Sequence, residues 1–209
     1  PLGVYETNLV PNNFAEWYNP NIPDVSEYDP ALAKSLLDEA GYTLDPATGK
    51  RIDPATGKVM RTLDLAYYSD IPFRGITWAQ PYAASLQSVG IPVNLAPCAF
   101  GTGEYYTKLV KANNYDIWLG GYMWAPGDPT ALDLIFSSHA ALPLGAYNNS
   151  AFDNLVYTAL HTFNHTEAVE ATWAAEALAM EDVAVIPAFS MTGNTAYSPD
   201  LVGYGIGKY

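Results

Sequence analysis

The side chains best suited to hold a ligand are aromatic rings beside a Gly-Asp-Pro turn. Tyr122 and Trp124 come at the end of an expected strand, and the turn that contains Asp128 follows them. Flat rings bind the apolar faces of neutral sugars and also suit hydrophobic side chains. Ligands of α/β proteins bind beyond the carboxyl ends of strands. We therefore predict ligand binding by these three residues and by Trp118 and Trp78, although a strand tryptophan and a helix tryptophan are more often part of a core.

The sequence gives less support for a catalytic or metal-binding site than for ligand binding. Two carboxylate pairs have the residue types of a glycoside hydrolase: Asp128 with Asp133, and Glu176 with Glu181. Helix positions five apart diverge around the axis, which argues against the second pair. His161 and His165 are four apart, but the capping residue Asn164 between them predicts a helix break. We expect no catalytic residue, no metal and no cofactor, and a hydrolase of unknown type is the alternative of another class.

The composition limits the class of protein further. Of 209 residues, 49% are apolar and 15% are charged, which favours a folded domain over disorder. The net charge of −13 argues against nucleic acid as a partner, because phosphate backbones require a basic surface. One cysteine, Cys98, excludes a disulfide within the chain. The first residues do not resemble a signal peptide, and no apolar run approaches the roughly 20 residues that span a bilayer.

The clearest element is a helix within Tyr28–Tyr42, which reads YDPALAKSLLDEAGY. Asp29 is a favourable N-cap, Pro30 is preformed for the first helical position, and Gly41 suits a left-handed C-cap. Apolar residues recur along one side of this helix at Leu32, Leu36, Leu37 and Ala40. The pattern predicts a short amphipathic helix.

The next elements alternate between turns, strands and helices. DPATGK occurs twice, at Asp45–Lys50 and Asp53–Lys58, and each copy is predicted to form a surface turn. Alternating apolar residues predict a strand over Thr62–Tyr68. A helix is expected at about Arg74–Ser88, and a strand at Ile91–Leu95.

The same alternation continues toward the end of the chain. We expect a helix near 103–111, a strand over 115–122, helices near 152–161 and 166–182, and an apolar run over 183–189. Ser150 with Asp153 forms a possible capping box for the first late helix, and Asn164 or Thr166 can cap the second. Such alternation predicts an α/β fold with a mainly parallel sheet flanked by helices, in one compact unit.

The amino-acid sequences of these segments resemble those of a known family. Tyr28–Tyr42 is similar to the "YDP..AK.LL.EAGY" segment in the C-terminal lobe of family 5 extracytoplasmic solute-binding proteins, the peptide, nickel and oligosaccharide receptors of ABC importers. Tyr115–Phe136 resembles the family's "YD....GY......DP....F" block, and FDNLV and VIPAF follow in the family's order. The resemblance implies that residues 1–209 are one lobe of a periplasmic-binding-protein-like fold, with the N-terminal lobe missing.

The resemblance also implies a function. Family members hold a solute between two lobes and deliver it to the membrane subunits of an importer, so we expect an extracytoplasmic receptor, membrane-anchored in its full-length form. Oligopeptide-binding relatives carry a "GW.ADY" segment whose aspartate receives the peptide ammonium, and Ala125 stands at that place here. A buried ammonium without a counter-charge is costly. The resemblance therefore favours a neutral oligosaccharide, with an oligopeptide as the alternative if Asp128 substitutes.

Overall fold

The computed structural model describes residues 3–24, 27–71, 75–121, 129–141, 147–191 and 200. They divide into two compact units. Unit 1 comprises Pro1–Ser26, Trp124–Pro143 and Tyr147–Tyr209, and unit 2 comprises Glu27–Met123 and Leu144–Ala146. The expectation of one compact unit is wrong, because both ends of the chain and an internal segment form a unit separate from the parallel sheet.

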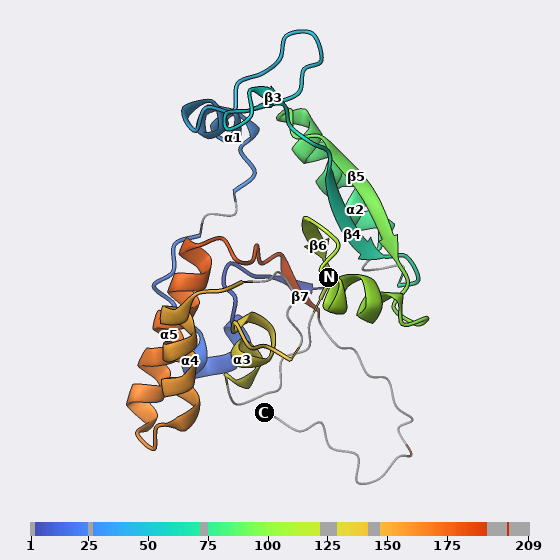
Figure 1. Cartoon of the computed structure of the whole chain (residues 1–209). Coiled ribbons are helices and arrows are strands. Elements are labelled where there is room, and N and C mark those ends of the chain that lie inside the picture. Colours follow the sequence, from blue (N-terminus) through green and yellow to red (C-terminus); the bar gives the residue numbers. More distant parts are fainter. Residues whose placement is uncertain are drawn as a thin grey trace. The chain divides into compact units, whose positions relative to one another are not determined.

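Unit 2 contains a parallel sheet with helices on both faces (Figure 1). Its elements are α1 (Pro30–Glu39), β2 (Ile52–Asp53), β3 (Lys58–Val59), β4 (Leu63–Tyr68), α2 (Ile76–Ser88), β5 (Val93–Cys98), the π-helical η3 (Tyr105–Lys111) and β6 (Ile117–Leu119). The strand order is β5-β4-β6, and Leu65 of β4 lies opposite Leu95 on one side and Ile117 on the other. The predicted parallel sheet is confirmed.

The central strand β4 has a different core on each face. Leu65 and Tyr67 pack with Ala79 and Ala83 of α2, whereas Ala66 packs on the other face with Cys98. This follows from the period of two in a strand, which sends successive side chains to opposite faces. Because β4 is buried on both faces, the sheet lies between two helical layers, with α2 on one face and η3 on the other.

The two copies of DPATGK fold in the same way. In each copy the aspartate side chain accepts from the N–H two residues later and from the threonine hydroxyl, at 3.2 and 2.5 Å for Asp45 and 2.9 and 2.9 Å for Asp53. In each, the glycine N–H donates to the aspartate carbonyl at 2.8 Å, and the glycine has φ +67. The predicted surface turns are confirmed, and the second closes the β2–β3 hairpin.

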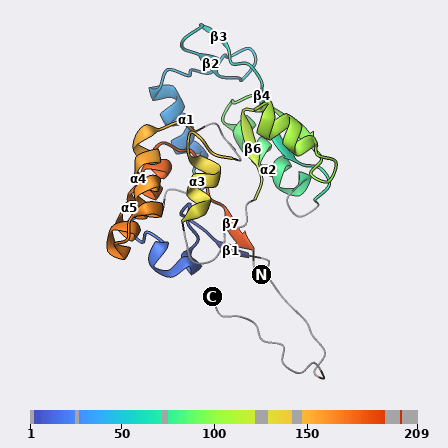
Figure 2. The ribbon, with the colours of Figure 1, turned by 60° about the horizontal axis from the view of Figure 1, so that its bottom comes forward.

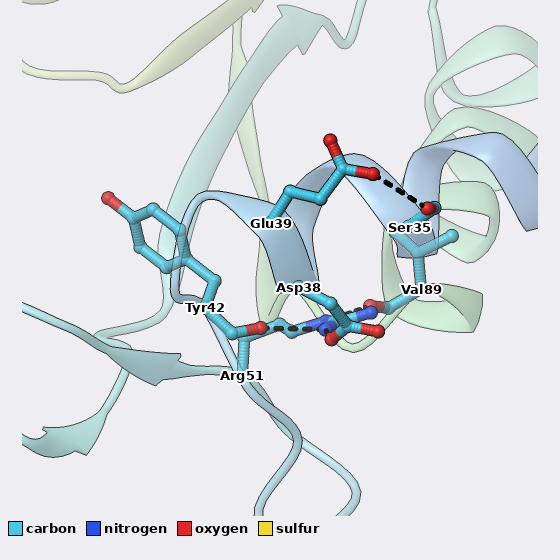
Figure 3. Close-up of polar contacts among 6 residues, drawn as sticks. All are labelled: Ser35, Asp38, Glu39, Tyr42, Arg51 and Val89. Carbon is cyan, nitrogen blue, oxygen red and sulfur yellow. Dashed lines mark hydrogen bonds and ion pairs between the residues drawn. The ribbon is translucent and has the colours of Figure 1, made fainter.

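Arg51 lies between the two turns, and its side chain is completely buried. Its Nε donates to the carbonyl of Val89 at 2.8 Å, and its Nη1 donates to the carbonyl of Tyr42 at 2.6 Å and pairs with Asp38 (Figure 3). Val89 is the C-cap of α2, and Tyr42 follows the end of α1. The guanidinium therefore joins the C-terminal ends of two helices, where a positive charge is favourable.

Unit 1 is built mainly from helices. Its elements are β1 (Gly3–Tyr5), the 3₁₀ segment η1 (Asn12–Trp17), α3 (Thr130–Phe136), α4 (Ser150–His161), α5 (His165–Glu181) and β7 (Phe189–Met191). The terminal strands β1 and β7 pair antiparallel, and α4 packs along α5 (Figure 2). The buried face of α5 carries small residues at Ala168, Ala171, Ala175 and Ala179, which let the neighbouring helix approach closely.

Some expected details differ from the structure. The apolar run over 183–189 enters a strand only at its last residue, because Val183 has φ 54 and, among the described residues, pairing with β1 begins at Phe189. The capping box at Ser150 is also wrong. Asn149 is the N-cap of α4, and the carboxylate of Asp153 instead accepts from Ser138.

We predict that replacing Arg51 with Met lowers the free energy of unfolding by about 1–3 kcal/mol for each helix-end carbonyl that loses its buried donor. Urea unfolding of the variant and the parent chain measures this difference. Arg61→Met is the matched control, because Arg61 pairs with Asp116 at the surface with 70% of its side chain exposed and should change stability far less. Equal losses for the two variants would show that Arg51 is not a special anchor.

Candidate ligand-binding site

Four aromatic rings gather at the carboxyl end of the parallel sheet in unit 2. We call Tyr68, Phe100, Tyr105 and Trp118 the aromatic cluster. The ring centre of Tyr68 lies 5.4 Å from that of Phe100, 5.6 Å from that of Tyr105 and 5.9 Å from that of Trp118. Tyr68 ends β4, and Phe100 follows the end of β5. The cluster thus lies where ligands of α/β folds bind.

Exposure differs sharply within the cluster. Tyr68 is 3% exposed and Phe100 is 51% exposed. The indole Nε1 of Trp118 is buried and has no hydrogen-bond partner among the described residues. Phe100 is therefore the member of the cluster most accessible to a solute, whereas Tyr68 is buried and packs against the other three rings. The sequence could have indicated both residues, because each stands at the end of a strand that pairs in parallel.

The acidic groups beside the cluster are already engaged by the protein. The carboxylate of Asp70 accepts the backbone N–H groups of Phe100 at 2.8 Å and Gly101 at 2.6 Å, which lowers its pKa. Glu104 pairs with Lys108 at 2.8 Å and accepts the N–H of Ala99, and these contacts lower its pKa. Both carboxylates hold the loop after β5 in place. The charge of Asp70 is balanced by two backbone N–H groups, and that of Glu104 by Lys108.

The structure describes the positions of two of the five predicted ligand-binding residues, Trp118 and Trp78. Tyr122, Trp124 and Asp128 lie outside the described residues. Trp118 belongs to the aromatic cluster, but Trp78 lies on α2, which packs on the opposite face of the sheet. Trp78 is 44% exposed. The structure therefore does not bring these two tryptophans together.

Trp118 depends on its neighbour Gly120. A Cβ atom built on Gly120 would lie 1.9 Å from the indole Cζ2 of Trp118 and 2.3 Å from its Cε2. The ring folds back over the glycine backbone, so a larger residue at this position must displace it. This contact fixes the ring at the end of β6, just before the segment that contains Tyr122 and Trp124.

The groups considered for catalysis or metal binding do not form such centres in the described part of the chain. Glu176 is buried and Glu181 is exposed, so this pair diverges as the helix geometry predicts. His161 stacks on Tyr157, with 4.1 Å between ring centres, and His165 approaches Glu16 at 3.2 Å. Helix α4 ends at His161 and Asn164 caps α5, which confirms the predicted break.

Neither of two surface pockets is lined by a residue of the aromatic cluster. One, of about 410 Å³, is in unit 2 beside the β2–β3 hairpin and is lined by residues that include Tyr42, Asp53 and Lys58. The other, of about 510 Å³, is in unit 1 and is lined by residues that include Trp17 and Phe163.

No helix in the described residues is both long and apolar enough for a membrane span.

Residues 2–141 match the model of the "Bacterial extracellular solute-binding proteins, family 5 Middle". This match covers more than half of the chain, and the chain belongs to that family. The curated relatives include the oligopeptide-binding protein OppA of Lactococcus lactis subsp. lactis strain IL1403, which is 27% identical over 185 residues. OppA of L. lactis subsp. cremoris strain SK11 is 29% identical over 154 residues. These alignments cover 82% and 71% of this chain but 28% and 24% of the relatives.

Solved structures share the fold. Lactococcal OppA in complex with an endogenous peptide superposes with a TM-score of 0.75 at 24% identity, over 91% of this chain and 35% of that protein. A mannohexaose-bound periplasmic oligopeptide-binding protein of Thermotoga maritima gives 0.73 at 19% identity, over 90% of this chain and 36% of that protein. The chain has the periplasmic-binding-protein-like fold and spans about a third of these solved proteins.

We predict that Gly120→Ala displaces the Trp118 ring and destabilises the fold by about 1–3 kcal/mol, the usual cost of overpacking. Near-ultraviolet circular dichroism reports the ring environment, and urea unfolding reports the free energy. The same substitution in a Trp118→Ala background should cost much less, because the clashing atoms are gone. An equal cost in both backgrounds would mean that the ring does not rest on Gly120.

Proposed function

We propose that this chain is part of the extracytoplasmic solute-binding component of an ABC importer. The observation that carries the proposal is the family match over residues 2–141. The aromatic cluster at the carboxyl end of the sheet supplies a surface suited to a solute. The role is binding and delivery to the importer's membrane subunits, without catalysis, in a full-length receptor that is anchored to the membrane.

We further propose that the parallel-sheet unit belongs to the C-terminal lobe of a two-lobe receptor. The chain covers 28% of the L. lactis relative in length, so the N-terminal lobe belongs to polypeptide beyond these 209 residues. Ligand would be held between the lobes and enclosed when they close about a hinge. On this lobe, Tyr122, Trp124 and Asp128, which follow β6 in the sequence, are proposed to contact the ligand.

An oligopeptide is the first proposed ligand. Supporting it, the L. lactis relatives carry the name oligopeptide-binding protein, and aromatic rings suit hydrophobic peptide side chains. Ala125 replaces the aspartate that the resemblance associates with the ammonium, and Asp70 and Glu104 are engaged by the protein. We therefore propose that the peptide is held through its backbone and side chains, without a dedicated ammonium partner.

A neutral oligosaccharide is the second proposed ligand. Among the described residues, the two carboxylates beside the aromatic cluster, Asp70 and Glu104, are engaged by the protein, which suits an uncharged solute, and rings of this kind stack on sugar faces. One structural neighbour was solved with mannohexaose. The two ligand classes differ in one measurable property, since only the peptide carries an ammonium that can be blocked.

We predict that a receptor of full length containing this sequence binds free and N-acetylated forms of one peptide with affinities within about threefold, because no carboxylate is reserved for the ammonium. Isothermal titration calorimetry of both peptides, of a neutral oligosaccharide and of Asp128→Asn measures this. If acetylation or the Asn substitution abolishes binding, Asp128 takes the ammonium. If the oligosaccharide binds and the peptides do not, the sugar assignment is correct.

We also predict that Trp124→Ala weakens ligand binding by about 1–3 kcal/mol, the range for losing one buried aromatic contact. The same titration with the preferred ligand measures the change. Trp124→Phe is the matched variant, because it keeps a ring and should recover most of the affinity. An unchanged dissociation constant in the Ala variant would remove Trp124 from the binding surface.

A further inference from the structure

Glu176 of α5 is a fully buried carboxylate in unit 1 that binds only backbone N–H groups. Its Oε1 accepts from Val10 at 2.9 Å, and its Oε2 accepts from Asn19 at 3.1 Å. These two donors flank η1 and lie 166 and 157 positions away in the sequence. One side chain thus fastens the chain to α5 on both sides of η1. We call residues 8–19 the N-terminal segment.

Other contacts place the N-terminal segment along the same helix. The indole Nε1 of Trp173 donates to the carbonyl of Glu16 at 2.9 Å. The Asn19 side chain donates to the carbonyl of Trp173 at 3.1 Å, and the Asn8 side chain donates to the carbonyl of Asn19 at 2.6 Å. Val10 is 1% exposed. The segment is therefore well packed, and Glu176 is the ionisable group at the centre of its attachment.

The titratable groups on the segments packed against α5 are Glu6, Glu16 and Tyr18 in or beside the N-terminal segment, and Asp153, Tyr157 and His161 on α4. Among the described residues, none of these groups and no lysine or arginine forms an ion pair with Glu176. Burial raises the pKa of Glu176 from 4.5 to about 7, and the N–H groups of Val10 and Asn19 oppose this rise only in part.

We propose that Glu176 is a pH-dependent latch that holds the N-terminal segment on α5 at acidic pH and loosens it progressively as the pH rises to neutral. Ionisation leaves a negative charge buried without a cation, and lifting the segment returns that charge to water. The chain passes from unit 1 to unit 2 after Ser26, so the latch fixes the stretch that leads into the ligand-binding unit.

The direction of the pH effect follows from proton linkage. The folded protein holds the Glu176 proton up to about pH 7, whereas the open form releases it above about 4.5. Between these values the folded state binds more protons, so its stability is full at low pH and declines as the pH rises. Opening of the segment should become easier by up to about tenfold per pH unit across this window.

Hydrogen exchange of the Val10 and Asn19 amides in the 209-residue chain tests the proposal. After correction for intrinsic exchange, protection should fall as pH rises from about 5 to 7 and then level off. In Glu176→Gln, which cannot ionise, protection should be lower at pH 5 but independent of pH. Glu170→Gln, an exposed site on the same helix, should retain the parent slope. A parent slope of zero, or an unchanged slope in Glu176→Gln, would overturn the latch.

A direct titration covers the case in which Glu176→Gln does not fold. The side-chain carboxyl resonance of Glu176 in the parent chain, labelled with ¹³C and followed by NMR, should titrate with a midpoint near pH 7. A midpoint near the ordinary value of 4.5 would show that the buried carboxylate is ionised throughout and that the attachment does not respond to pH.

Discussion

The buried guanidinium of Arg51 is the contact on which the first half of unit 2 depends. A buried permanent charge needs partners, and here Nε and Nη1 find them in Asp38 and in the carbonyls at two helix ends, whose last carbonyls otherwise lack donors, whereas Nη2 has no partner among the described residues. The repeated DPATGK turns flank Arg51 and make the same kinds of hydrogen bond on either side of it. Gly90 completes the arrangement, since a Cβ at this residue would lie 3.2 Å from Cγ of Arg51. A local repeat thereby acquires a long-range role.

Local chemistry made several elements predictable. Asp29 caps α1 through the N–H groups of Ala31 and Leu32, and Gly41, with φ +87, ends it as its type suggests. The fate of the apolar side of α1 was not predictable, and Leu32 and Leu36 are each 55% exposed. Periodicity identifies which side of a helix is apolar, but it does not say what covers that side. The β1–β7 pair was missed for a related reason, because its partners are separated by almost the whole chain.

The candidate site shows the same division. Trp118 was identifiable as an aromatic residue near the end of a strand, and alternation along β6 places it opposite the face covered by α2. Trp78 is also aromatic, but it lies in the first turn of α2, which covers the other face. Tyr68 and Phe100 were less conspicuous, because they become a cluster only through the parallel register that sets Tyr68 opposite Cys98. Residue type therefore indicated aromatic ligand binding, and the register of the strands determined which aromatic residues lie together.

Arg51 and Glu176 solve one problem with opposite charges. Each is buried, each is held mainly by backbone groups, and each fastens a segment that sequence periodicity does not place. Their responses to pH differ for a physical reason, because a guanidinium stays protonated at any ordinary pH, whereas a carboxyl group can lose its charge. The attachment in unit 2 is therefore constant. The attachment in unit 1 can be adjusted, and it holds the stretch of chain that precedes the unit in which solute binding is proposed.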